Sequence, residues 1–212
     1  RRSSNIFSKE DKHKLEGLTR NTNCIVLSDE VYEHMVFDGF THQSACLFPD
    51  LKERTFITAS FGKTFHNTGW KMGYCCGPKE LMKEFIKVHQ FNVYCVNHPI
   101  QIALAEYLKE ARNYKQLDSF YENKRNLFLE AIKESKFSFK PSKASYFQLL
   151  NYSAISTEND VDFAKRLVTE FGVASIPLSV FNTNRLDEKV LRFCFAKKEE
   201  TLLKAAEILN TL

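Results

Sequence analysis

The sequence predicts an α/β protein, in which a first part with α/β layering is followed by a smaller α+β unit. Over about the first hundred residues, short apolar runs alternate with helix-like stretches, which is typical of α/β layering. A long helical region then begins near residue 99, and shorter segments follow it. We therefore expect two domains, one over residues 1–112 and one over residues 113–212 that includes the connecting helix.

The elements of the first part are predicted from caps and apolar runs. Ser8 is the expected N-cap of the first helix, because acidic residues follow it in the first turn. The wholly apolar residues 24–27 predict a strand that is buried on both faces. The other elements expected here are strands at residues 55–60 and 72–77 and a helix from about Pro78.

A long helical region joins the two parts, spans about residues 99–136 and has a predicted break near residues 112–113. A helix of this length is the kind of connector that bridges two domains. The elements expected after it are strands at residues 145–150, 173–176 and 191–195 and helices at residues 160–170 and 198–212.

Composition excludes several classes of protein. The net charge of +4 is spread along the chain without a block of like charge, so we expect no nucleic-acid partner and no membrane surface. No run approaches the roughly 20 apolar residues of a membrane span, and no signal-peptide pattern is present, so we expect a cytoplasmic protein. The six cysteines lack C-x-x-C spacing and a histidine cluster, which favours buried reduced thiols and no metal site.

Chemically informative residues follow two of the predicted strands. Asp29 and Tyr32 come directly after residues 24–27, whereas Ser60 and Lys63 come at and just after the end of residues 55–60. In open α/β sheets ligands bind outside the carboxyl ends of strands, so this is where a site is expected. Taken singly, such an acid can be a helix cap, and such a lysine is usually a solvated surface group. Only the combination of these residues predicts a site.

Together with Lys71, these residues supply what a phosphorylated pyridine aldehyde requires. The carboxylate of Asp29 can keep the pyridine nitrogen protonated, and Tyr32 can donate a hydrogen bond to the phenolate oxygen. Ser60 and Lys71 can bind the phosphate. Lys63 can form a Schiff base with the aldehyde and, once a substrate amine displaces it, act as the base that moves a proton. The predicted cofactor is pyridoxal 5'-phosphate.

Three motifs carry a family resemblance: S-D-E-V-Y-E-H at residues 28–34, S-F-G-K-T-F-H-N-T-G-W-K-M-G-Y at residues 60–74 and L-R-F-C-F-A at residues 191–196. Through them the chain resembles the fold-type I, class I/II aminotransferases. Within that family it is similar to the branch that contains kynurenine aminotransferase, glutamine transaminase K and bacterial methionine aminotransferase. The similarity covers residues 5–212. It implies that residues 1–112 are the C-terminal half of the family's large domain, which is a mixed sheet with helices. It also implies that residues 113–212 are the small α+β C-terminal domain.

The resemblance implies a role for each site residue. Arg192 matches the arginine that binds the substrate α-carboxylate as a bidentate pair, although by itself it could be a surface arginine at a strand edge. Many relatives have arginine where Lys71 stands, and lysine neutralises the phosphate without the planar fork of arginine. The implied cofactor contacts are Asp29 with the pyridine nitrogen, Tyr32 with the phenolic oxygen, Lys63 as the Schiff-base lysine, and Ser60 and Lys71 with the phosphate.

The implied reaction is transfer of the amino group of an L-amino acid to a 2-oxo acid, with methionine, glutamine or aromatic amino acids as donors. An acidic substrate would need a second arginine to bind its distal carboxylate, and no motif in the sequence indicates one. Neutral candidates for a side-chain pocket are Phe65, His66, Tyr94 and Phe181, and core packing explains each of them equally well.

Two alternatives stay open. A cysteine-S-conjugate or cystathionine β-lyase uses the same lysine and cofactor but eliminates a group from Cβ. A non-catalytic ligand-binding module, like the aminotransferase-like domains of some transcription regulators, is the second alternative. The sequence shows neither a helix-turn-helix nor a basic stripe in its support.

The sequence also departs from the family pattern. The family's asparagine and proline before the first helix align with Arg1 and Arg2, and its glycine before the aromatic strand appears as Ala144. The N-terminal half of the family's chain has no counterpart here. We therefore expect these residues to come from a longer protein that forms a homodimer, and we expect the 212 residues alone to show little or no transaminase activity.

Overall fold

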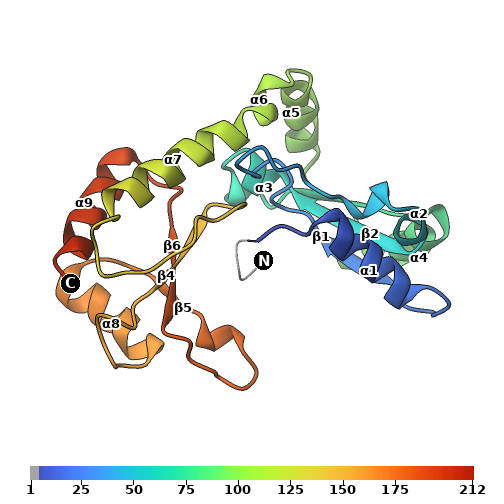
Figure 1. Cartoon of the computed structure of the whole chain (residues 1–212). Coiled ribbons are helices and arrows are strands. Elements are labelled where there is room, and N and C mark those ends of the chain that lie inside the picture. Colours follow the sequence, from blue (N-terminus) through green and yellow to red (C-terminus); the bar gives the residue numbers. More distant parts are fainter. Residues whose placement is uncertain (1–4) are drawn as a thin grey trace. The chain divides into compact units, whose positions relative to one another are not determined.

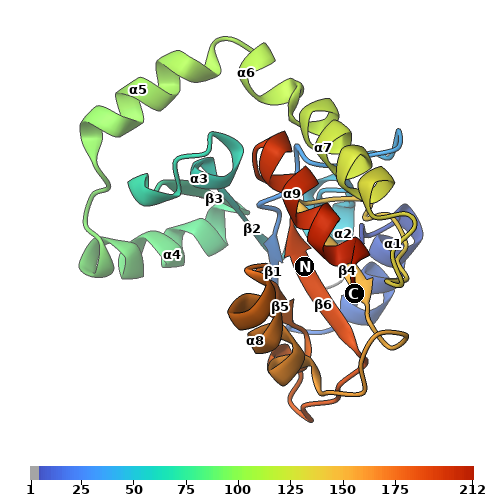
Figure 2. The ribbon, with the colours of Figure 1, turned by 90° about the vertical axis from the view of Figure 1, so that its left-hand side faces the viewer.

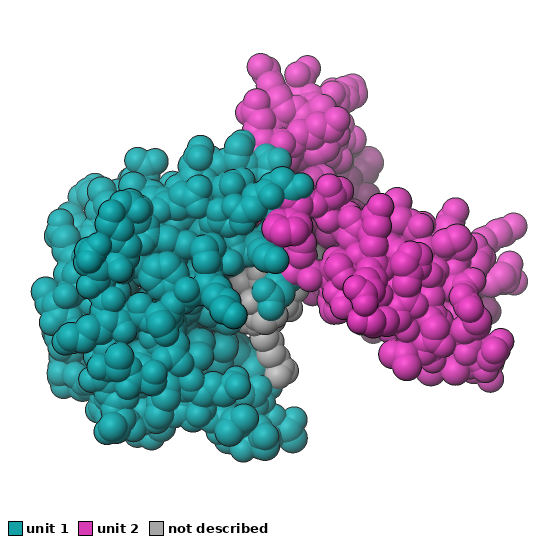
Figure 3. All heavy atoms as spheres, in the orientation of Figure 1, with its two compact units in different colours: residues 1–5, 37–39, 118–212 teal, residues 6–36, 40–117 magenta. Residues whose placement is uncertain are grey.

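A computed structural model describes residues 5–212, so Arg1 and Arg2 lie outside the described residues. The chain divides into two compact units (Figure 3). The N-terminal unit comprises Ile6–Val36 and Phe40–Leu117, and the C-terminal unit comprises Asn5, residues 37–39 and residues 118–212. The division falls between Leu117 and Asp118, a few residues beyond the domain boundary expected at residue 112.

The N-terminal unit contains a mixed three-stranded sheet in the order β1-β2-β3 (Figure 1). Strands β1 and β2 are parallel, with Asp29 beside Thr58, and β2 and β3 are antiparallel, with Ser60 beside Gly73. The carboxyl end of β2 and the start of β3 therefore lie together. The strands are β1 (Val26–Asp29), β2 (Thr55–Ser60) and β3 (Gly73–Cys76).

Helices pack on both faces of this sheet. On one face Val26 and Ile57 contact a core cluster of Ala45, Phe48 and Leu51, which also receives Leu15 from α1. On the other face the ring of Phe56 lies 6.0 Å from that of Phe85 in α4. The elements involved are α1 (Lys9–Thr19), the 3₁₀ turn η1 (Ala45–Leu47), α2 (Pro49–Lys52) and α4 (Lys79–Asn92).

Two predicted helix starts are confirmed. The hydroxyl of Ser8 accepts from Asp11 N–H at 3.1 Å, and the Asp11 carboxylate accepts from Ser8 N–H at 2.9 Å, which forms a capping box. Pro78 is the N-cap of α4, where its missing N–H costs nothing.

The expectation of a strand at residues 24–27 that is buried on both faces is wrong. Strand β1 begins at Val26, and the side chains of Ile25 and Leu27 are 58% and 71% exposed. The reason is that β1 is the edge strand among the described residues, and only the face that carries Val26 is covered by the core cluster.

The expectation of buried thiols is also wrong. All six cysteines are free, but Cys24, Cys46, Cys76 and Cys95 are exposed, and Cys75 and Cys194 are half-buried. The four exposed cysteines lie at or beyond the ends of strands and helices or in the short turn η1.

The long helical region is divided more finely than expected. The helices are α5 (His98–Leu108), the single turn α6 (Arg112–Lys115) and α7 (Leu117–Ala131). The first break thus comes at residues 109–111, slightly before the predicted position, and the region ends at Ala131 instead of residue 136.

The C-terminal unit is a small α+β structure. Its antiparallel sheet has the order β4-β6-β5, and α9 lies beside α7, where Asn210 donates to the carbonyl of Ala131 at 2.9 Å (Figure 2). Phe163, Leu191 and Leu209 are fully buried in its core. The elements are β4 (Phe147–Asn151), α8 (Asp160–Phe171), β5 (Ile176–Pro177), the 3₁₀ turn η3 (Ser179–Phe181), β6 (Val190–Cys194) and α9 (Glu199–Asn210).

The strand expected at residues 173–176 is almost entirely absent. Gly172 has a φ of 71° and caps α8, and the N–H of Val173 bonds back to the carbonyl of Leu167 at 2.9 Å. Val173, the first residue of the expected strand, thus completes the C-terminal cap of α8. Only Ile176 and Pro177 pair with β6.

Residues 37–39 join the C-terminal unit through a buried arginine. Arg125 is 2% exposed and donates to both carboxylate oxygens of Asp38 at 2.7 Å. Phe37 is fully buried and donates its N–H to the carbonyl of Lys143 at 3.0 Å. No local pattern in the sequence indicates this connection between the segment after Tyr32 and α7.

A Gly73→Ala substitution should destabilise the protein. A Cβ at Gly73 would lie 2.5 Å from the backbone oxygen of Ala59, so β2 and β3 would have to separate. We expect a loss of about 1–3 kcal/mol in the free energy of unfolding, measured by chemical denaturation. Gly69→Ala is the matched control, because nothing lies within 4 Å of a Cβ built there. Equal stability of the two variants would contradict the prediction.

Candidate functional site

A pocket of about 360 Å³ lies in the N-terminal unit at the end of β2. The structure brings three predicted site residues together there, because Ser60, Lys63 and Lys71 all line it. The remaining lining residues are Gly62, Thr68, Met72 and Gly73. Asp29, Tyr32 and Arg192 do not line this pocket.

Local chain geometry accounts for this convergence. The short helix α3 (Phe61–Thr64) starts directly after Ser60 and carries Lys63, and the 3₁₀ turn η2 (Thr68–Trp70) follows. A Cβ at Gly62 would come within 3.0 Å of Thr68 Cα, so glycine permits the close approach of α3 and η2. Lys71 has a φ of 56°, a left-handed conformation that turns the chain from η2 towards β3.

The pocket is positively charged. Within residues 5–212, neither Lys63 nor Lys71 has a hydrogen-bond or ion-pair partner, and no carboxylate is among the lining residues. The hydroxyls of Ser60 and Thr68 add donors. Two ammonium groups beside two hydroxyls suit an anion such as a phosphate dianion, so these residues fit the predicted phosphate group of the cofactor.

Asp29 lies at the end of the neighbouring strand. It is in register with Thr58, and because side chains alternate along strands, Asp29, Thr58 and Ser60 face the same side of the sheet. Asp29 is exposed, and its Oδ1 accepts only a weak bond from Val31 N–H at 3.2 Å. Its carboxylate is therefore on the same face as Ser60, which lines the pocket.

Tyr32 follows in a turn. The N–H of Glu33 bonds to the carbonyl of Glu30 at 2.9 Å, and the N–H of Met35 bonds to the carbonyl of Tyr32 at 3.0 Å. Tyr32 is 9% exposed, so this turn holds its ring largely buried.

Two carboxylates that flank Tyr32 were not assigned a role from the sequence. Glu30 is 2% exposed; burial raises the pKa of its carboxyl, but hydrogen bonds from His42, Ala45 N–H, Ser44 and Ser28 outweigh this and lower the pKa to about 2. Glu33 accepts a hydrogen bond from the hydroxyl of Tyr74 in β3. Burial, and then this bond, raise the pKa of Tyr74 above its usual value. The available sequence signal was a second acid beside Asp29 in the S-D-E-V-Y-E-H motif.

Arg192 lies in β6 of the C-terminal unit, in contact with two aromatic rings. Its Cζ is 4.2 Å from the ring centroid of Phe147 and 5.1 Å from that of Phe181. Its Nε is buried, and among the described residues it has no hydrogen-bond partner. A guanidinium that is stacked on rings and left without an acid is suited to bind a carboxylate.

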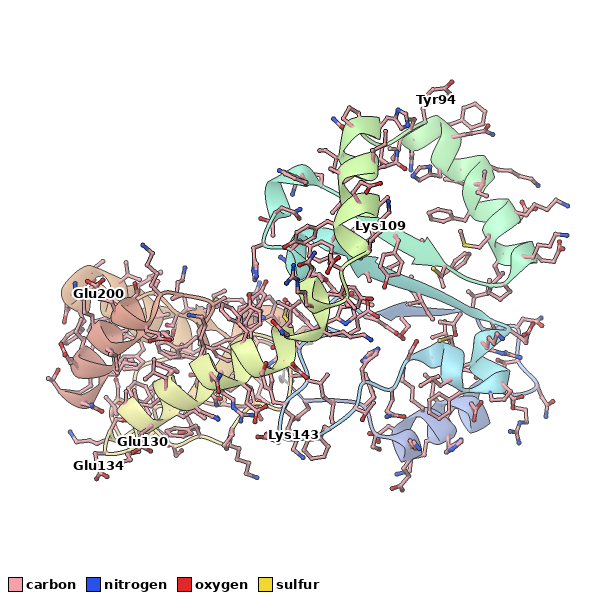
Figure 4. The ribbon with its side chains drawn as sticks, turned by 90° about the horizontal axis from the view of Figure 1, so that it is seen from above. Tyr94, Lys109, Glu130, Glu134, Lys143 and Glu200 are labelled. Atoms are coloured by element: carbon pink, nitrogen blue, oxygen red, sulfur yellow. The ribbon has the colours of Figure 1, made fainter. Side chains whose placement is uncertain are left out.

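The four residues that were candidates for binding the substrate side chain differ in exposure and in contacts. Phe65 packs edge-on against Tyr107, with ring centroids 5.2 Å apart. His66 is exposed. Tyr94 is 86% exposed at the turn that joins α4 to α5 (Figure 4). Phe181 contacts Arg192, the residue predicted to bind the substrate carboxylate.

Two further properties bear on the site. Over the described residues, no helix is both long and apolar enough to cross a membrane. The same residues contain no group of three or more histidines, cysteines or acids that could hold a metal ion.

The chain matches known proteins along its length. The family model for class I and II aminotransferases matches residues 4–209. Methionine aminotransferase of Escherichia coli is 44% identical over 99% of this chain and 55% of its own length. Kynurenine–oxoglutarate transaminase of Dictyostelium discoideum is 32% identical over 98% of this chain and 53% of its own length.

The fold is matched by solved structures. A crystal structure of an Escherichia coli protein with a methionine aminotransferase function has a TM-score of 0.96 and 44% identity. The match covers 99% of this chain and 56% of that one. The chain thus spans about half the length of the curated relatives it matches.

Proposed function

Because this chain belongs to the class I and II aminotransferases, we propose that its protein transfers the amino group of an L-amino acid to a 2-oxo acid, with pyridoxal 5'-phosphate as cofactor. The observation that carries the proposal is the pocket at the end of β2, where Lys63 and Lys71 have no partner among the described residues. A carboxylate, Asp29, lies on the same face of the sheet as the pocket residue Ser60.

Each residue would have a separate task. When bound, pyridoxal phosphate supplies an electron sink for negative charge that develops at the substrate Cα. Ser60 and Lys71 would bind its phosphate, Asp29 would pair with its ring nitrogen and Tyr32 would contact its phenolic oxygen. Lys63 would hold the aldehyde carbon through Nζ and, once freed, would take the proton from the substrate Cα.

Arg192 would bind the α-carboxylate that amino acid and oxo acid share. Its contacts with the rings of Phe147 and Phe181 support this role, because the rings restrict the guanidinium without neutralising its charge. We propose methionine, glutamine or an aromatic amino acid as donor. The resemblance to methionine aminotransferase and the aromatic ring of Phe181 beside Arg192 support a neutral side chain.

We also propose that the full-length protein is a cytoplasmic homodimer. The dimer rests on the family resemblance alone. The location is supported by the six free thiols, four of them exposed, because exposed thiols persist in a reducing compartment.

Mixing full-length protein, pyridoxal phosphate, methionine and a 2-oxo acid tests the reaction. We expect the methionine-derived 2-oxo acid and the new amino acid to appear in equal amounts, measured by chromatography. Pyruvate and ammonia released from cysteine S-conjugates without any added 2-oxo acid would identify a β-lyase instead. Tight cofactor binding with neither reaction, across methionine, glutamine and aromatic donors, would indicate a ligand-binding module.

A further inference from the structure

We propose that Glu30 is a positioning residue, which holds Asp29 and Tyr32 in the arrangement that the cofactor requires. This inference rests on the proposed function and adds to it a residue that does not itself contact the cofactor. All the contacts that support it lie within the N-terminal unit.

The backbone of Glu30 is fixed on both sides. Its N–H donates to the carbonyl of Thr58 at 2.8 Å, which extends the pairing of β1 with β2 by one residue past Asp29. Its carbonyl accepts from Glu33 N–H at 2.9 Å, which closes the turn that carries Tyr32. Glu30 thus links the strand end that presents Asp29 to the turn that presents Tyr32.

The side chain of Glu30 points away from Asp29. Because side chains alternate along a strand, Ser28 and Glu30 face the core cluster, whereas Asp29 faces the other side. On that side the carboxylate accepts several hydrogen bonds. Its Oε1 accepts from Ala45 N–H at 2.9 Å and from Ser28 Oγ at 2.8 Å, and its Oε2 lies 2.8 Å from His42 Nε2.

These donors connect the site to a rigid part of the unit. Ala45 is fully buried and belongs to the cluster with Phe48 and Leu51. Asp29, by contrast, has a single weak bond of its own, to Val31 N–H at 3.2 Å. The position of the Asp29 carboxylate therefore depends on the backbone that Glu30 anchors. Removing the Glu30 carboxylate would leave its buried donors unpaired, which is costly. We therefore expect the backbone that carries Asp29 and Tyr32 to shift.

The chain contains a matched comparison in Glu16. Glu16 is 6% exposed, accepts from Asp50 N–H at 3.1 Å and lies 2.9 Å from His13 Nδ1. It is therefore a buried carboxylate bound to a backbone N–H and a histidine, like Glu30. Glu16 ties α1 to the first turn of α2, and no site residue adjoins it. If both carboxylates contributed only to stability, replacing either of them should have the same effect on cofactor binding.

The test is the dissociation constant of pyridoxal phosphate for full-length protein, measured by fluorescence titration for Glu30→Met and Glu16→Met. Methionine keeps the length of the side chain and removes the carboxylate. Residues that orient a ligand-binding group typically contribute about 10–100-fold in affinity at metal sites, so we expect an increase of about tenfold or more for Glu30→Met. We expect no change for Glu16→Met, although both variants should unfold more easily.

Equal dissociation constants for the two variants would overturn the inference, because Glu30 would then contribute to stability alone. If Glu30→Met does not fold, Glu30→Gln against Glu16→Gln decides in the same way. The amide keeps one acceptor oxygen, so a smaller increase is expected, confined to residue 30. Wild-type protein that binds no pyridoxal phosphate would overturn the proposed function and this inference together, and the wild-type titration shows which of the two has failed.

Discussion

Replacing Lys63 with alanine should remove the visible absorbance that the full-length protein acquires with pyridoxal phosphate and should abolish amino-group transfer. Lys63 lines the pocket and has no partner among the described residues, so its amine is available to the cofactor aldehyde. The variant loses both the covalent attachment and the base that moves the substrate proton. Because proton transfer by a positioned side chain contributes about 10²–10⁴-fold by itself, we expect kcat to fall at least about a thousandfold.

Two further variants separate the causes of this loss. Lys63→Arg keeps a positive charge in the pocket but has no free amine, so it should lack the visible absorbance while still binding inorganic phosphate. Lys79→Ala, at the first residue of α4, removes an exposed lysine outside the pocket and should behave as wild type. Wild-type absorbance and turnover in Lys63→Ala would refute the assignment of the lysine.

Replacing Arg192 with alanine should raise KM for the amino acid and for the 2-oxo acid alike. Both substrates carry the carboxylate that this guanidinium is proposed to bind, and its Nε is already buried without a partner among the described residues. Truncating one member of a buried, hydrogen-bonded charge pair costs about 2–5 kcal/mol, so kcat/KM should fall at least about thirtyfold. Steady-state kinetics with each substrate varied in turn would measure this.

The absorbance of the bound cofactor should persist in Arg192→Ala, because Arg192 is not assigned to cofactor binding. Arg192→Lys should recover only part of the loss, since lysine lacks the planar fork and stacks poorly on Phe147. Arg185→Ala is the control, because Arg185 is an exposed arginine of the same unit. An unchanged KM for both substrates would exclude Arg192 as the carboxylate residue.

Some of the candidate site followed from the sequence, because its residues lie close to recognisable strand ends. Strand β2 ends at Ser60 as expected, and Lys63 comes in the next turn. The role proposed for Glu30 could not be predicted from the sequence. Its donors His42 and Ala45 lie 12 and 15 residues further along the chain, beyond the range of any local pattern.

The sequence alone determined the features that depend on neighbouring residues. The capping box of Ser8 and the start of α4 at Pro78 each rest on interactions within a few residues, where chain geometry leaves few alternatives.

Only the tertiary structure decided which apolar residues are buried and which distant segments meet. Leu27 is exposed because β1 is an edge strand among the described residues, and β5 is short because Gly172 and Val173 complete α8. Residues 37–39 join the C-terminal unit through Arg125. Burial and strand pairing depend on register and on partners far along the chain, and no local pattern of side chains specifies them.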